Sequence, residues 1–122
     1  MMDQNIQTAL ENDEVIDITT IGRKSGQPRR IEIWFRQVNG RIYITGTPGT
    51  RHWYANMLAN PRITFHLKQS VTADLPATVH PITDNAARRQ IFSDPVMRWY
   101  HQRAQDIEAL VERSPLVEVI FD

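Results

Sequence analysis

The sequence predicts a mainly β fold in which about six strands form a small barrel accompanied by helices. Three observations support this prediction. Alternating apolar and polar residues recur in short runs, the pair Asn39-Gly40 separates two of these runs, and a helical pattern precedes the last one. Asn-Gly is the preferred pair for a tight turn between antiparallel strands. The 122 residues are 41% hydrophobic, enough for one core, so we expect a single domain over residues 1–122.

The first part of the chain predicts three strands. Residues 1–13 are polar with a weak helical pattern, which fits either a short helix or a frayed end. After them, the run VIDITTI alternates and is rich in β-branched side chains, as a half-buried strand requires. The runs IEIWF and RIYIT flank the Asn-Gly pair and predict a hairpin. The third strand ends at GTPGT, because glycine and proline interrupt regular pairing.

A short helix and two further strands follow. Thr50 is the expected N-cap of the helix RHWYANMLAN, and Asn60-Pro61 ends it. The run RITFHL places every second residue on one apolar face, and VTADLPATVH repeats that pattern. Pro76 lies within the second run and has no N–H to donate, so it indicates a sheet edge or a bulge.

The last third of the chain predicts two helices and a final strand. Asp84 and Asp94 are typical helix starts, and Pro95 follows the second of them. We expect the second helix to cover residues 95–113, because large side chains recur there at helical spacing. These side chains are Trp99, Arg103, Ile107, Leu110 and Val111. The run LVEVIF then predicts the sixth strand.

The composition excludes several classes of protein. Lys and Arg number 14, as do Asp and Glu, so no net charge attracts nucleic acid or an anionic membrane. Cysteine is absent, and the four histidines lack metal-ligand spacing, so we expect no metal site. We also find no membrane-spanning run and no secretion signal at the start. We therefore expect a soluble, cytoplasmic protein whose partner is a small molecule.

The stretch TIGRKSGQPRR forms a basic turn between the first two strands. Its cations are Arg23, Lys24, Arg29 and Arg30, and Ser25 and Gly26 lie among them. Guanidinium, ammonium, hydroxyl and exposed N–H groups are those that bind phosphate. A solvated surface loop would explain the same composition. The turn is therefore a candidate anion site that needs a second observation.

That observation is the segment TGTPGTRHW after the third strand. It adds hydroxyl groups and places Arg51 in the first turn of a helix, where exposed N–H groups favour an anion. Two such loops on one sheet predict a phosphorylated ligand. Several aromatic side chains could stack on a planar part of that ligand, although core packing is the alternative for each. They are Trp34, Tyr43, Trp53, Tyr54, Trp99 and Tyr100.

Three motifs in order resemble the deazaflavin-dependent nitroreductase family, whose members use coenzyme F420. The motifs are TTIGRKSGQPRRIEIWF, GRIYITGT and WYANMLANPRITFHL. The match covers roughly residues 18–67, with a weaker echo in SPLVEVIF. The resemblance implies a six-stranded split β-barrel of the FMN-binding type. It also implies that the basic turn holds the coenzyme phosphate and that the ring lies beside the loop after the third strand.

The resemblance suggests roles for individual residues. Arg23, Lys24, Ser25 and Arg29 match the phosphate-binding turn, to which the basic composition adds Arg30 and Arg51. Thr45, Gly46 and Thr47 match the segment that passes the ring. Trp53 and Asn56 belong to the helix motif, which we expect to fix the loop. Tyr100 is the candidate catalytic residue, because related proteins present tyrosines near the substrate from a late helix.

The implied function is an oxidoreductase that transfers a hydride from reduced F420 to a small electrophilic acceptor such as a quinone, nitroaromatic or enone. The loop GTPGTRHW is shorter than the version common in the family, so FMN remains the alternative coenzyme. A non-catalytic module that binds a flavin or deazaflavin is a second alternative, and a nucleic-acid binder is a third that the neutral charge disfavours. We favour a homodimer, because a barrel this small often leaves an apolar face uncovered.

Overall fold

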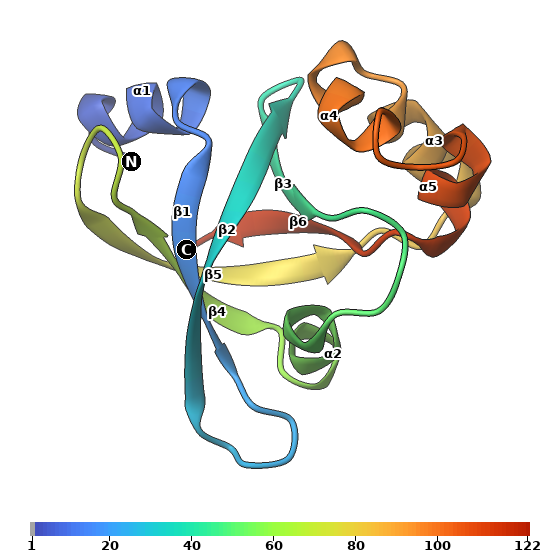
Figure 1. The fold of residues 1–122 in the computed structure, drawn as a ribbon. Coiled ribbons are helices and arrows are strands. Elements are labelled where there is room, and N and C mark those ends of the chain that lie inside the picture. The colour runs from blue at the N-terminus through green and yellow to red at the C-terminus, as the bar shows by residue number, and fades with distance from the viewer. Residues whose placement is uncertain (1) are drawn as a thin grey trace.

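The computed structural model describes residues 2–122 and contains a closed six-stranded barrel (Figure 1). The strands are β1 (Val15–Ile21), β2 (Pro28–Val38), β3 (Arg41–Thr45), β4 (Arg62–Leu67), β5 (Ala73–Pro81) and β6 (Leu116–Phe121). All neighbouring pairs are antiparallel, in the order β1-β2-β3-β6-β5-β4. The predicted fold class is confirmed. The sixth strand closes the barrel by inserting between β3 and β5.

The β1–β2 hairpin is longer than the barrel wall. β1 pairs with β2 over its whole length, up to Ile21 opposite Pro28, but it pairs with β4 only as far as Thr19. The tip of the hairpin therefore projects beyond the barrel, as Figure 1 shows. The tip consists of the basic turn, so the fold presents the turn away from the core. The second hairpin has the predicted turn, with positive φ at both Asn39 and Gly40.

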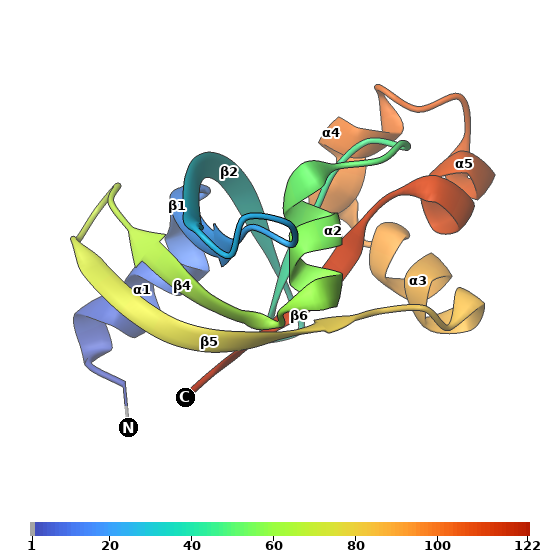
Figure 2. The same cartoon turned by 90° about the horizontal axis from the view of Figure 1, so that it is seen from below.

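The first helix and the late helices lie on opposite sides of the barrel, and the second helix lies apart from both (Figures 1 and 2). They are α1 (Gln4–Asn12), α2 (His52–Ala59), α3 (Asn85–Phe92), α4 (Arg98–His101) and α5 (Ile107–Arg113), with a 3-10 turn η1 at Pro95–Met97. Figures 1 and 2 show α1 at one side and the group α3 to α5 at the other. Of the two alternatives for residues 1–13, a short helix or a frayed end, the structure has the helix, which covers Gln4–Asn12. Asp84 and Asp94 cap α3 and η1 as predicted, each accepting a backbone N–H.

Two hydrophobic clusters fill the molecule. The first occupies the barrel interior, where Phe35 meets Phe65 edge to face at a centroid distance of 5.3 Å. The second lies between the outer face of the sheet and the late helices, and Tyr43, Tyr100 and Leu116 belong to it. β3 contributes to both clusters, because it is covered on both faces. Tyr43 is therefore a core residue and not a ligand-stacking one.

Two predicted helix boundaries are wrong. The single helix over 95–113 is divided into η1, α4 and α5, because residues 102–105 form a turn and Asp106 caps a new helix at Ala109 N. Trp99 is consequently exposed and not on a buried face. At α2, Arg51 and not Thr50 is the N-cap, and no side chain caps that end. Pro76 behaves as predicted, because β6 pairs with β5 only from Ala77 and leaves an edge.

Candidate active site

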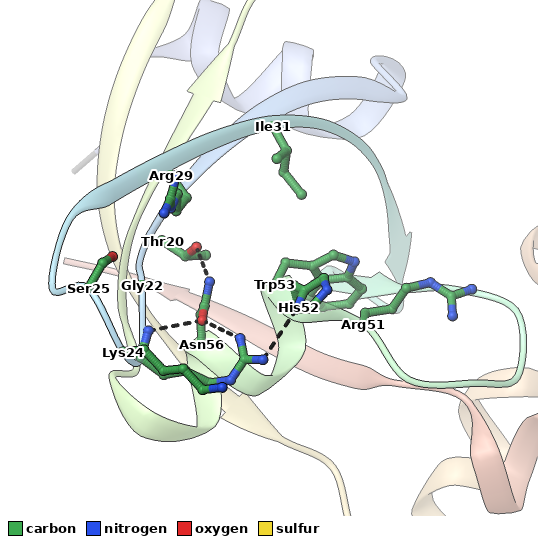
Figure 3. Close-up of a pocket in the computed structure, with 11 residues that line it drawn as sticks. Thr20, Gly22, Lys24, Ser25, Arg29, Ile31, Arg51, His52, Trp53 and Asn56 are labelled. Atoms are coloured by element: carbon green, nitrogen blue, oxygen red, sulfur yellow. Dashed lines mark hydrogen bonds between the residues drawn. The ribbon is translucent and has the colours of Figure 1, made fainter.

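A pocket of about 610 Å³ lies between the basic turn and α2 (Figure 3). We call it the basic pocket. Its lining residues are Thr20, Gly22, Arg23, Lys24, Ser25, Arg29, Ile31, Arg51, His52, Trp53 and Asn56. The predicted residues of the basic turn and of the α2 motif thus face one another, although about 30 positions separate them in the sequence. Strand pairing brings them together, because the β1–β2 hairpin folds back beside α2.

Asn56 connects α2 to the basic turn. Its side chain is buried, and its Oδ1 accepts the backbone N–H of Arg23 at 3.1 Å and the Arg23 Nη1 at 2.9 Å. The Arg23 Nη2 also lies 3.2 Å from His52 Nδ1 on α2. Figure 3 shows both arms of this network. Asn56 thus holds the basic turn against α2, and its part in binding a coenzyme stays a prediction.

The turn itself is tightly folded at Gly22. Its backbone N–H donates to the Gln27 carbonyl at 2.8 Å, and its carbonyl accepts the Gly26 N–H at 2.9 Å. A Cβ atom at Gly22 would lie 2.5 Å from Ser25 Oγ. Gly26 has a φ of 69°, in the left-handed region that favours glycine. The positive φ of Gly26 and the crowding beside Gly22 both favour glycine in this turn.

The basic pocket contains cations without acidic partners. Within residues 2–122, no ion pair includes Arg23, Lys24 or Arg29. Three cations close together repel one another unless an anion lies among them. The Ser25 hydroxyl accepts the Gln27 N–H at 3.2 Å and keeps its own proton for a ligand. This donor set is the one that binds phosphate oxygens.

The predicted cofactor-binding residues include Arg30, but Arg30 lies outside the basic pocket. Its Nε pairs with Asp17 Oδ2 at 3.0 Å on the outer face of the sheet. Arg29 and Arg30 are neighbours on β2, and successive side chains of a strand point to opposite faces. Lys68 binds the same Asp17 at 2.6 Å and Glu32 at 2.5 Å. The hydrogen bonds from Lys68 and then from Arg30 hold the pKa of the Asp17 carboxyl below its usual range.

Arg51 lies between the basic pocket and two further pockets, and it lines all three. Its Nη2 donates to the Thr47 carbonyl at 3.1 Å and to Thr47 Oγ1 at 2.9 Å. Figure 3 shows the guanidinium pointing away from Lys24 and Arg29. The prediction that Arg51 occupies the first turn of α2 is therefore wrong: it precedes the helix and braces the loop after β3.

A second pocket of about 270 Å³ adjoins the first, and we call it the aromatic pocket. It is lined by Glu32, Ile33, Trp34, Arg36, Thr45, Gly46, Thr47, Arg51, Trp53, Trp99 and Tyr100. Arg51 and Trp53 line both pockets, so the two pockets meet at these side chains, and we call the pair of pockets the groove. The walls of the aromatic pocket come from β2, from the loop after β3, from α2 and from α4. The groove has a cationic end and an aromatic end, which suits an elongated ligand with an anionic group and a planar ring.

The predicted ring segment lies in the aromatic pocket. Thr45 is buried, and its Oγ1 donates to the Pro115 carbonyl at 2.6 Å, which ties the loop to the start of β6. A Cβ atom at Gly46 would lie 3.4 Å from Arg51 Nη2, so the loop and that guanidinium are closely packed. Tyr100 is 3% exposed, and burial raises the pKa of its hydroxyl, while Arg36 opposes that rise. The hydroxyl therefore stays protonated at neutral pH.

Sequence reasoning missed several lining residues. Thr20, Ile31 and His52 belong to the basic pocket, and Arg36 belongs to the aromatic pocket. Arg36 continues the alternation that places Trp34 on the outer face of β2. That alternation could have identified it, but α4 covers this face through contacts that no local pattern encodes. Within residues 2–122 no helix is long and apolar enough to cross a bilayer, and no three candidate ligands gather as for a metal.

Comparison with known proteins identifies relatives of this chain. A family model described as F420H(2)-dependent quinone reductase matches residues 2–117. The solved structure of an F420 reductase has a TM-score of 0.70 at 16% identity, covering 100% of this chain and 96% of that one. A Clostridium acetobutylicum protein related to general stress protein 26, of the pyridoxinephosphate oxidase family, has a TM-score of 0.71 at 12% identity. That match covers 98% of this chain and 86% of that one. A structure described as a domain-swapped dimer scores 0.58 at 18% identity, covering 88% and 80%.

Proposed function

The chain belongs to the F420H2-dependent quinone reductase family, and from this premise we propose that it reduces a quinone and holds the coenzyme in the groove described above. Family membership makes the protein an F420-dependent oxidoreductase, as the sequence predicts. The acceptor and the residues that bind each ligand are our proposal. The observation that carries it is that the basic and aromatic pockets adjoin, with Arg51 and Trp53 lining both.

The basic pocket is the proposed site of the coenzyme phosphate. Arg23, Lys24 and Arg29 supply charge there, and Ser25 supplies a hydroxyl donor. The donor set fits a phosphate group, because its cations lack acidic partners among residues 2–122. Asn56 keeps the Arg23 backbone in place before the coenzyme arrives. A turn fixed in advance loses less conformational entropy when a ligand binds.

The aromatic pocket is the proposed site of the reaction. Bound F420, when reduced, supplies the hydride. Thr45, Gly46 and Thr47 form the wall along which a planar ring would pass, and Trp53 is the side chain shared with the basic pocket. The chain contributes orientation and exclusion of water, since two stacked planar molecules react only at close approach. The Tyr100 hydroxyl, protonated at neutral pH, is the proposed donor to the product oxygen.

The proposal extends to assembly and location. We propose a homodimer, which the domain-swapped relative supports, and sedimentation of the purified protein tests this. We also propose a cytoplasmic location, which the absence of cysteine suits. Nitroaromatic compounds are proposed as secondary acceptors, because they are planar electrophiles of similar size to small quinones.

The test is an anaerobic assay with purified protein, F420H2 and an acceptor. We expect F420H2 oxidation with menadione and slower oxidation with a nitroaromatic compound, each followed at the coenzyme absorbance. Titration with FMN is the parallel arm, since the pyridoxinephosphate oxidase family relative has the same fold. Tight FMN binding without any response to F420 would contradict the proposal. Binding of F420H2 without oxidation by any acceptor would instead favour a carrier.

A further inference from the structure

A buried cation lies at the inner wall of the aromatic pocket. Arg36 on β2 is 7% exposed, and its guanidinium carbon lies 5.1 Å from the centre of the Trp34 ring and 5.3 Å from that of Tyr100. Its Nη1 donates to the Phe35 carbonyl at 3.0 Å. Two rings and one hydrogen bond therefore fix the plane of this guanidinium.

Arg36 has no acidic partner. Among residues 2–122, none of the ion pairs includes it. A guanidinium has five N–H donors, and a buried charge is costly unless it is paired. Among residues 2–122, Ser114 Oγ is the only fully buried side-chain nitrogen or oxygen that lacks a hydrogen-bond partner. No Arg36 nitrogen is in that class. The remaining Arg36 nitrogens are therefore not fully enclosed, and Arg36 lines the aromatic pocket.

Two acidic residues lie near this cation, but within residues 2–122 neither forms an ion pair with it. Glu14 is near enough to raise the pKa of the adjacent Tyr100, and it does not line the pocket. Glu32 is the acidic residue that lines the pocket, but its carboxylate is bound by Lys68 at 2.5 Å. Arg51 adds a second positive charge to the lining, although it hydrogen-bonds Thr47. The pocket thus combines a positive field with exposed indole rings, because Trp34 and Trp99 are each 43% exposed. This combination suits a planar aromatic molecule with a negative oxygen.

We propose that Arg36 determines acceptor specificity by pairing with an oxygen anion, so that the aromatic pocket prefers quinones that carry an acidic hydroxyl. This inference rests on the proposed function, in which the aromatic pocket receives the acceptor. The ring of such a quinone stacks against Trp34 or Trp99, and its oxyanion receives hydrogen bonds from the Arg36 nitrogens that face the pocket. A neutral quinone of the same size makes the stacking contact alone.

Arg36 also supports the reduction. Hydride transfer delivers two electrons and one hydrogen to the quinone, and the reduced coenzyme of the proposed function is oxidised. Both carbonyl double bonds of the quinone are lost: the hydrogen ends on one carbonyl oxygen, and the other carries a new negative charge until a proton from Tyr100 or water converts it to a hydroxyl. Arg36 has further N–H donors for a carbonyl oxygen next to the bound oxyanion, and they stabilise the charge that develops there.

The test measures binding without the coenzyme. The purified protein is titrated by calorimetry with lawsone, a hydroxynaphthoquinone that is an anion at neutral pH, and with menadione, which has no acidic hydroxyl. We expect lawsone to bind about ten-fold more tightly, the ratio that a hydrogen bond to a charged group supplies. Arg36→Met should bring the ratio close to one. Arg36→Lys should keep part of the preference, because it retains the charge without the planar fork.

Arg103 provides the matched control. Its guanidinium lies 4.0 Å from the centre of the Trp99 ring, but Arg103 does not line the pocket. Arg103→Met should leave the lawsone preference unchanged, and thermal unfolding checks that each variant is folded. Equal binding of the two quinones by the natural protein would overturn the inference. So would a preference that persists in Arg36→Met, and Arg36→Lys gives the readout if the methionine variant does not fold.

The outcome is separable from that of the proposed function. A lawsone preference that depends on Arg36, together with no response to F420, would refute the proposed coenzyme site and leave the anion site standing. F420H2 oxidation with no dependence of acceptor preference on Arg36 would refute the inference alone.

Discussion

Replacing Asn56 with alanine should loosen the basic turn and weaken coenzyme binding. The substitution removes an acceptor of two hydrogen bonds, one from the Arg23 backbone N–H and one from its charged Nη1. A neutral hydrogen bond contributes about 1 kcal/mol and one to a charged group about 1.5–3 kcal/mol. The sum suggests a loss of about 2.5–4 kcal/mol in the free energy of unfolding. For a domain of this size, the melting temperature should fall by roughly 10 °C.

Two further variants separate stability from ligand binding. Asn60→Ala is the matched control, because Asn60 ends the same helix and its side chain accepts one long hydrogen bond of 3.3 Å at the surface. Asn60→Ala should change the melting temperature and the F420 affinity little. Asn56→Asp keeps the acceptor but places a negative charge in the basic pocket, so it should melt close to the natural protein and bind F420 weakly. Differential scanning fluorimetry and F420 titration measure both effects. If Asn56→Ala melts like Asn60→Ala and binds F420 like the natural protein, the reasoning is refuted.

Three other predictions concern acid stability, the late helices and the turn. The pKa of Asp17 is lowered in the folded protein, so its ion pairs stabilise the fold above about pH 4. This stabilisation is lost as the pH falls through the folded pKa. The free energy of unfolding of Asp17→Asn, measured with urea, should therefore depend less on pH over that range. The buried Arg88 donates to the carbonyls of Ile82, Leu110, Val111 and Ser114. Arg88→Met should therefore lower the free energy of unfolding by about 3 kcal/mol. The control is Arg89→Met, which breaks a surface ion pair with Glu108 and should unfold nearly as the natural protein does. Gly22→Ala should reduce F420 affinity without unfolding the barrel, because the added Cβ meets Ser25 Oγ at the projecting tip; unchanged affinity would contradict this.

Local patterns were sufficient to predict the barrel. Alternation in VIDITTI and RITFHL, together with the Asn39-Gly40 turn, depends on neighbouring residues only. The order of motifs also predicted that the basic turn and the α2 motif serve one ligand, and the structure places them around one groove. The features that the sequence did not predict depend on tertiary contacts. The apolar spacing of the predicted late helix continues across residues 102–105, so it hid the new start that Asp106 caps.

Two arginines show where residue patterns mislead. Arg30 shares the basic composition of the turn, but it stands on a strand and faces the opposite side from Arg29. Arg36 reads as a polar, outward residue of β2, yet α4 covers that face and buries it beside Tyr100. Composition wrongly assigned Arg30 to the cofactor site and overlooked Arg36 as a pocket residue. Both errors arise because the direction of a side chain depends on which elements pack against its strand.

The neighbouring arginines also provide the most direct test of the coenzyme site. F420 is titrated into the natural protein, Arg29→Ala and Arg30→Ala, and the dissociation constants are compared at one salt concentration. We expect Arg29→Ala to bind at least about ten-fold more weakly, since it loses a hydrogen bond between charged groups. Arg30→Ala should bind as the natural protein does, because its side chain pairs with Asp17 outside the groove. Equal losses in the two variants, or no loss in either, would contradict the assignment of the basic pocket to the coenzyme phosphate.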